Sequence, residues 1–249
     1  MRTRHGIIPA VLLLVLVWRA PDVRAAAEVH RLNVVISAVP TQLRAADFNN
    51  LIGDVNRTVL EPRGLAPLDK ITLSWMFDAE VRYFARQNLA VGVGVSRLRA
   101  ITSQEYLPTI GASNTLRAEI TSIPIHAGAA YYFTPYNQGD FQARAYVGAG
   151  FMNMVYNRAT QRWDGTGIPA GQAFRWSGTN DGPGYYGEVG VHLFFASKLS
   201  VLLSGLHRSN EVRNLVNEDT GAPIVNAQGK VVSLDVGGTG FRMAVGIGL

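Results

Sequence analysis

The chain has 249 residues, of which 47% are hydrophobic and 16% charged, with 23 basic against 18 acidic residues. This length suits one large domain or two small ones, and so low a charge argues against a disordered or coiled-coil protein. The absence of cysteine excludes disulfides, cysteine-ligated zinc, thioether-linked haem and thiol nucleophiles. The mean hydropathy of +0.09 is high for a soluble protein, yet the only long apolar run lies at the N-terminus.

That run, residues 7–18, follows a basic stretch and precedes the small-x-small pattern Val23-Arg24-Ala25. The arrangement predicts a secretory signal peptide, residues 1–25, cleaved after Ala25 or, nearly as well, after Ala27. An uncleaved anchor is disfavoured because about 20 apolar residues are needed to cross a membrane. Removing four arginines and one aspartate leaves 19 basic and 17 acidic residues in the expected mature domain, 26–249. The formal charge of +5 therefore does not indicate a nucleic-acid partner.

The informative pattern in the mature chain has a period of two. From Ile71 to Tyr83 every odd position is apolar, and five of the six even positions are polar. Such alternation predicts a half-buried strand. Similar segments predict eight strands in all, at residues 31–39, 71–83, 89–95, 123–133, 141–151, 185–195, 199–208 and 241–249. Upstream of the fourth, apolar residues change parity, which predicts a β-bulge near Thr121–Ser122.

The connections alternate in length. Short turns are expected at 85–88, 134–140 and 196–198, and long Gly/Pro/Asn-rich loops separate the other strands. An even number of strands with short turns at one end and long loops at the other is typical of an outer-membrane barrel. Within the first long loop, apolar residues recur at intervals of three and four positions over residues 45–60, which predicts one helix.

Two features favour a membrane barrel over a soluble one. Aromatic residues gather beside the short turns, as in the interfacial girdle of a membrane barrel. The face opposite the apolar one is rich in glycine and alanine, which suits a narrow lumen better than a water-exposed sheet. We therefore predict an all-β fold: an eight-stranded antiparallel transmembrane β-barrel with short periplasmic turns, long extracellular loops and one short loop helix.

The mature chain resembles the small bacterial outer-membrane β-barrels, the OmpA-like and OmpW-like group. The resemblance rests on the residue runs 80–83 (EVRY), 89–95 (LAVGVGV), 123–125 (IPI), 131–133 (YYF) and 146–150 (YVGAG). The end, GFRMAVGIGL at 240–249, resembles the C-terminal assembly signal of such proteins, but Leu249 stands where the group favours Phe or Trp. The resemblance implies an outer-membrane location and a contact between the last strand and the assembly machinery.

The candidate site is the lumen. An eight-stranded barrel is just wide enough to be filled by side chains, so inward charges must pair. The parity predicts an inward polar network of Asp78, Glu80, Arg82, Arg117, Glu119, Arg144, Glu188, His192 and Arg242.

We expect no catalytic, cofactor-binding or metal-binding residues. His126 lacks the serine two residues on that barrel lipid deacylases carry, and His207 has that spacing only at a strand end. The Asn217-Glu218-Asp219 stretch has oxygen ligands without EF-hand spacing.

Three functions remain open. The first is a monomeric structural or surface protein whose loops bind partners; the helix 45–60 and the loop 157–183, with Trp163, Phe174 and Trp176, offer such surfaces. The second is a porin-like, narrow passive channel for small, perhaps apolar, solutes, as the OmpW-like resemblance implies. The third is a lipid-modifying enzyme. The expected partners are outer-membrane lipid and lipopolysaccharide, with no nucleic acid.

Overall fold

The computed structural model describes residues 30–109, 112–166, 174–195 and 198–249. The predicted signal peptide and its cleavage site lie outside the described residues. Within those ranges, no helix is long and apolar enough to cross a membrane.

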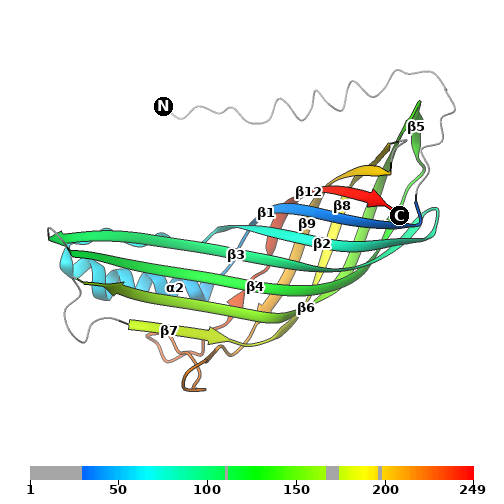
Figure 1. Cartoon of the computed structure of the whole chain (residues 1–249). Coiled ribbons are helices and arrows are strands. Elements are labelled where there is room, and N and C mark those ends of the chain that lie inside the picture. The colour runs from blue at the N-terminus through cyan, green and yellow to red at the C-terminus, as the bar shows by residue number, and fades with distance from the viewer. Residues whose placement is uncertain (1–29, 110–111, 167–173, 196–197) are drawn as a thin grey trace.

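Eight antiparallel strands close into a barrel, as predicted (Figure 1). Each strand pairs with the next around the wall, and β12 pairs with β1 to complete the circle. In order around the wall they are β1 (Leu32–Gln42), β2 (Leu73–Arg86), β3 (Leu89–Thr109), β4 (Ala112–Tyr132), β6 (Phe141–Gly165), β8 (Gly182–Phe195), β9 (Leu199–Val212) and β12 (Gly238–Gly248).

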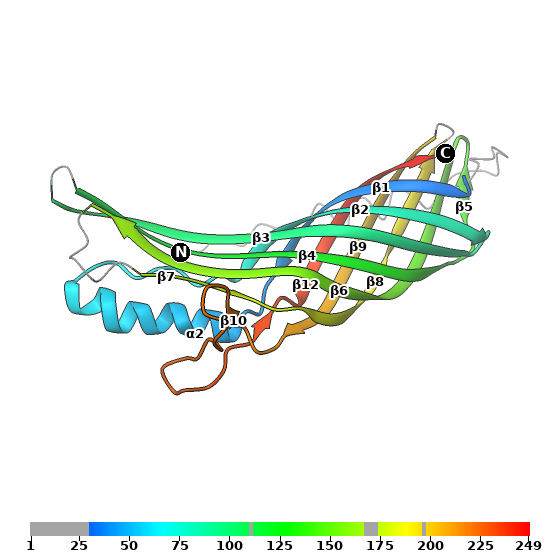
Figure 2. The ribbon, with the colours of Figure 1, turned by 60° about the horizontal axis from the view of Figure 1, so that its bottom comes forward.

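Three strands are much longer than the rest. β3 and β4 have 21 residues and β6 has 25, whereas the other five have 11 to 14. Their far halves leave the barrel as a tall curved sheet, extended by β7 (Phe174–Thr179) (Figures 1 and 2). We call this extension, with the segments packed on it, the head.

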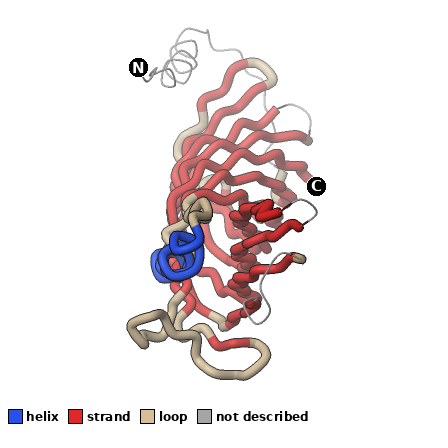
Figure 3. The backbone as a smooth tube through the Cα atoms, turned by 90° about the vertical axis from the view of Figure 1, so that its left-hand side faces the viewer, coloured by secondary structure: helices blue, strands red, loops and turns tan. Residues whose placement is uncertain are grey.

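The predicted loop helix is present and belongs to the head. It comprises α2 (Ala46–Val55), a π-helical turn (Asn56–Leu60) and a 3-10 turn (Glu61–Arg63). Phe48 and Ile52 are fully buried in one cluster with Leu116 and Ile120 of β4, so the helix covers the inner face of the extension (Figure 3). The short strands β5 (Tyr136–Gln138), β10 (Val216–Asn217) and β11 (Leu234–Asp235) complete the structure.

The outward face of the barrel is apolar. Side chains exposed on it define what we call the apolar belt; they include Ile36, Trp75, Phe77, Val81, Val91, Val93, Val95, Ile125, Val147, Phe151, Val189, Val191, Leu203, Met243, Val245 and Ile247. So large a continuous apolar surface is not stable in water.

The aromatic residues near the short turns divide between the two faces. Tyr131 and Phe133 point outward and are 47% and 49% exposed, as a girdle requires. Their neighbour Tyr132 points inward, where it stacks on Tyr146 at 5.2 Å between ring centroids. The aromatics thus also fill the lumen at this end.

A β-bulge lies close to the predicted position near Thr121–Ser122, but in the partner strand rather than in β4. The irregularity lies in β6, where Val155 is unpaired between Tyr156, opposite Ile123, and Met154, opposite Pro124. β4 keeps one parity throughout. Its apolar residues point outward in the barrel but inward in the head, because there the inner side of the sheet is covered by the helix and shielded from water.

Candidate functional site

Arg242 of β12 is the hub of the barrel lumen and is 4% exposed. Its Nη2 donates to Asp78 Oδ2 at 2.6 Å and to Glu80 Oε2 at 2.9 Å, and its Nη1 lies 3.3 Å from Glu188 Oε2. The three carboxylates come from β2 and β8, on opposite sides of the hub. One guanidinium therefore ties the walls of the barrel together across its interior.

A second arginine extends the network toward the short turns. Arg82 Nε donates to Glu80 Oε1 at 2.7 Å, and its Nη1 donates to the Tyr132 hydroxyl at 2.7 Å. That hydroxyl lies 3.1 Å from His192 Nδ1. Because every member is buried, each charge needs such partners to offset its desolvation.

His126 also joins the network, although the sequence reasoning did not include it. Its Nε2 lies 2.7 Å from Asp78 Oδ1, and Ser96 donates to the same oxygen at 2.8 Å. The signal was available, because His126 shares the inward parity of Pro124 and Gly128. Tyr146 and Ser204, which both donate to Glu188 Oε1, were missed in the same way.

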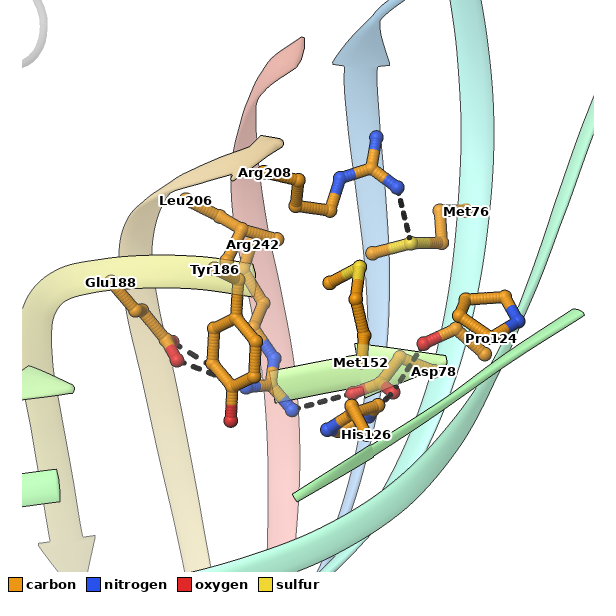
Figure 4. A pocket seen from close by; sticks show the side chains of 11 residues that line it. Met76, Asp78, Pro124, His126, Met152, Tyr186, Glu188, Leu206, Arg208 and Arg242 are labelled. Carbon is orange, nitrogen blue, oxygen red and sulfur yellow. Dashed lines mark hydrogen bonds and ion pairs between the residues drawn. The ribbon is translucent and has the colours of Figure 1, made fainter. Parts of the chain in front are cut away.

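The lumen is closely packed around the ion-paired network. The void beside Arg242, lined also by Asp78, His126 and Tyr186, has a volume of ≈ 20 Å³ (Figure 4). A void of that size holds about one water molecule. Glycine makes this packing possible: a Cβ on Gly94 would lie 2.6 Å from His126 Nε2.

Arg208 closes the network on the side of the head. Its Nη2 donates to Thr41 Oγ1 at 2.8 Å and its Nη1 lies 3.0 Å from Met76 Sδ (Figure 4). Its Nε has no partner among the described residues, and no ion pair is formed there. The sequence did not single out this residue because the apolar Leu202 and Leu206 share its face of β9, which hides the alternation there.

Seven of the nine predicted network residues point into the lumen, and six are linked through hydrogen bonds. Arg144 points inward but bonds instead to Gln142, at 2.7 Å, and to the Gln87 carbonyl at the short-turn end.

Arg117 and Glu119 correct the prediction, because they lie on the outer surface of the head. Without a bulge in β4 they keep the outward parity of Ile123 and Ile125. The two side chains pair with each other at 2.7 Å.

No group of three metal-ligating side chains comes together in the described part of the chain. The Ser200–His192 pair has its oxygen and Nε2 2.9 Å apart, but both residues are buried and the other ring nitrogen faces Tyr132 rather than a carboxylate. A triad needs an orienting third group and access for substrate. Chemically, the lumen holds a buried network of ion pairs.

The predicted binding aromatics of the loop 157–183 also lie differently. Trp163 is 2% exposed, and Trp176 packs edge-on against Phe48 at 5.9 Å between ring centroids. Phe174 begins β7. The two tryptophans therefore belong to the core of the head.

No protein-family model and no curated protein matches the chain. Among solved structures it is similar to Neisserial surface protein A, with 14% identity over 88% of this chain and 97% of that one (TM-score 0.41). It is also similar to the N-terminal β-barrel domain of Pseudomonas aeruginosa OprF, with 14% identity over 86% and 96% (TM-score 0.34). Ail of Yersinia pestis shows 11% identity over 88% and 98% (TM-score 0.31). At these values neither ligands nor activities carry over to this chain.

Proposed function

We propose that the chain is a monomeric integral protein of the bacterial outer membrane, with a closed lumen and a surface role exercised by its head. The observation that carries the proposal is the pairing of an apolar belt outside with an ion-paired lumen inside. This inverted arrangement is what a barrel in lipid requires. A soluble barrel has its apolar face inside.

The orientation follows from the two ends of the barrel. Both described chain ends, near Leu32 and Gly248, lie at the short-turn end. In bacterial outer-membrane barrels this end faces the periplasm and the long loops face outward. The head would then project from the cell surface, and β12 would be the strand that contacts the assembly machinery.

The closely packed lumen favours this role over a passive channel. Conduction would require Arg242 to leave three carboxylates, and leaving buried charges unpaired is costly. A lipid-modifying enzyme is less well supported, because the Ser200–His192 pair is buried inside the lumen rather than open to lipid. All three functions predict the same location. Only the channel predicts a flux of solutes, and only the enzyme predicts altered lipids.

The test combines location with flux. The full chain, produced in a Gram-negative host, should fractionate with the outer membrane and migrate in gels as a heat-modifiable species. Liposomes carrying the purified protein should swell no faster in small sugars or amino acids than empty ones. Recovery in the soluble fraction would overturn the location, solute flux would overturn the closed lumen, and altered lipid mass spectra would favour the enzyme.

A further inference from the structure

The outer surface of the head and its border with the apolar belt carry six arginines. The cross-strand register locates the boundary: the belt ends at the paired residues Ile123 and Tyr156, and the next outward pair is Thr121 and Arg158. Arg97 and Arg99 of β3 lie at this boundary, opposite Phe77 and Trp75 of the belt. We call the surface from the boundary outward the arginine surface. Its arginines are Arg97, Arg99, Arg117, Arg158, Arg162 and Arg175.

Three of these arginines form one row across three strands. Arg117 of β4 is the register partner of Arg162 in β6, which is in turn the partner of Arg175 in β7. Like charges directly opposite one another on a sheet destabilise it. A row of this kind is stabilised when an anion lies across it.

Local carboxylates neutralise only part of the charge. Glu119 pairs with both Arg99 and Arg117 at 2.7 Å, Glu218 with Arg158 at 2.7 Å, and Asp164 with Arg162 at 3.1 Å. Neither Arg97 nor Arg175 has a carboxylate partner in the described part of the chain. The buried Nε of Arg117 also has no acceptor there. Six arginines against three carboxylates leave unused donors on this face.

The surface is hollowed at two adjoining places. One depression of ≈ 340 Å³ is lined by Arg97, Arg158, Ile123 and Tyr156, and so begins at the belt. The other, of ≈ 230 Å³, is lined by Arg117, Arg162 and Arg175. Glu119, Arg158 and Thr160 lie on the border that the two share. Two neighbouring cationic hollows can accept two anionic groups of one molecule.

We propose that the arginine surface binds the phosphorylated sugar headgroup of a lipid in the outer leaflet. Guanidinium groups bind phosphate with paired, planar hydrogen bonds. The hollow that begins at Ile123 and Tyr156 would receive the phosphate nearest the membrane, while the acyl chains lie along the apolar belt below. This continuity with the belt selects a lipid rather than a soluble anion. The inference rests on the proposed membrane location and adds the ligand class.

The binding test uses the full mature protein folded in detergent or nanodiscs. The probes are a diphosphorylated, acylated glucosamine disaccharide, the same lipid without phosphates, and inorganic pyrophosphate. We expect the diphosphorylated lipid to bind at least about tenfold more tightly than the dephosphorylated one, and more weakly as salt rises. Equal affinity for the two lipids would overturn the proposal. Pyrophosphate that competes as strongly as the lipid would replace it with a soluble-anion site.

The variants separate the site from the fold. The double variant Arg162→Gln/Arg175→Gln removes two positive charges from this surface and should weaken lipid binding about tenfold, whereas Glu119→Gln should strengthen it. Arg86→Gln, which changes an exposed arginine beside a short turn, is the matched control and should bind normally. Unchanged affinity in the double variant would contradict the inference. The heat-modifiable gel shift, measured in parallel, reports separately whether the barrel itself has formed.

Discussion

Arg242 Nη2 lies 2.6 Å from Asp78 Oδ2, although the two residues are 164 positions apart in the chain. The contact joins β12 to β2 across β1, which lies between them in the wall. It therefore forms only once the barrel has closed.

Replacing Arg242 with alanine should be strongly destabilising. The change leaves Asp78, Glu80 and Glu188 buried without their shared counter-charge, which costs about 3–5 kcal/mol. Urea titration of the protein in lipid vesicles, followed by the heat-modifiable gel shift, measures the loss. Arg86→Ala, at an exposed position, should change the free energy of unfolding by less than about 0.5 kcal/mol. Equal effects of the two substitutions would contradict the role of the hub.

A charge placed on the belt should be costly in proportion to its depth. Val93 and Ser103 both point outward from β3, but Val93 lies in the belt and Ser103 in the head. Val93→Arg should lower the free energy of unfolding in lipid by about 2–4 kcal/mol, and Ser103→Arg by about 0–1 kcal/mol. The same urea titration measures both variants. If Val93→Arg cost no more than Ser103→Arg, the belt would not lie in lipid.

Gly150 should not accept a side chain, because its neighbours approach too closely. A Cβ there would lie 2.6 Å from Tyr186 Cε1 and 2.7 Å from Gly128 Cα, whereas one on Gly187 would meet nothing within 4 Å. Gly150→Ala should therefore destabilise the barrel by about 1–3 kcal/mol. Gly187→Ala, on the next strand, serves as the control and should be neutral or slightly stabilising.

The stability of the head should depend on pH through Glu119. Partial burial raises the pKa of this carboxyl, but the hydrogen bonds and charges of Arg99 and Arg117 outweigh it, so the pKa lies below its ordinary value of 4.5. The contribution of ionised Glu119 is therefore present above pH 4.5 and is lost as the pH falls through the lowered pKa.

Glu119→Gln should accordingly cost stability at neutral pH, and its difference from wild type should shrink as the solution is acidified below pH 4.5. Hydrogen exchange across β4 measures the local stability. Ser103→Ala, which removes no titratable group from an exposed position of β3, should show no such pH-dependent difference. A Glu119 difference that does not change with pH would refute the electrostatic explanation.

The sequence by itself determined the barrel, its strand count and its loop helix. Alternation along a strand is a local property: each side chain points opposite to its neighbour, so Ile71–Tyr83 shows the two faces without knowledge of any other strand. The same local rule predicted most of the polar residues of the lumen, because Asp78, Glu80 and Arg82 share one face of the strand.

Only the tertiary structure decided which residues meet and where the environment changes. Parity assigns a face but not a partner, and the partners of Arg242 depend on how the wall closes. Arg117 and Glu119 were misplaced because the apolar side of β4 is the outer one at the apolar belt and the inner one in the head, where α2 covers the sheet. Apolar residues then change parity without any change in the backbone. That switch, which is a property of the surroundings, also positions the arginine surface next to the apolar belt.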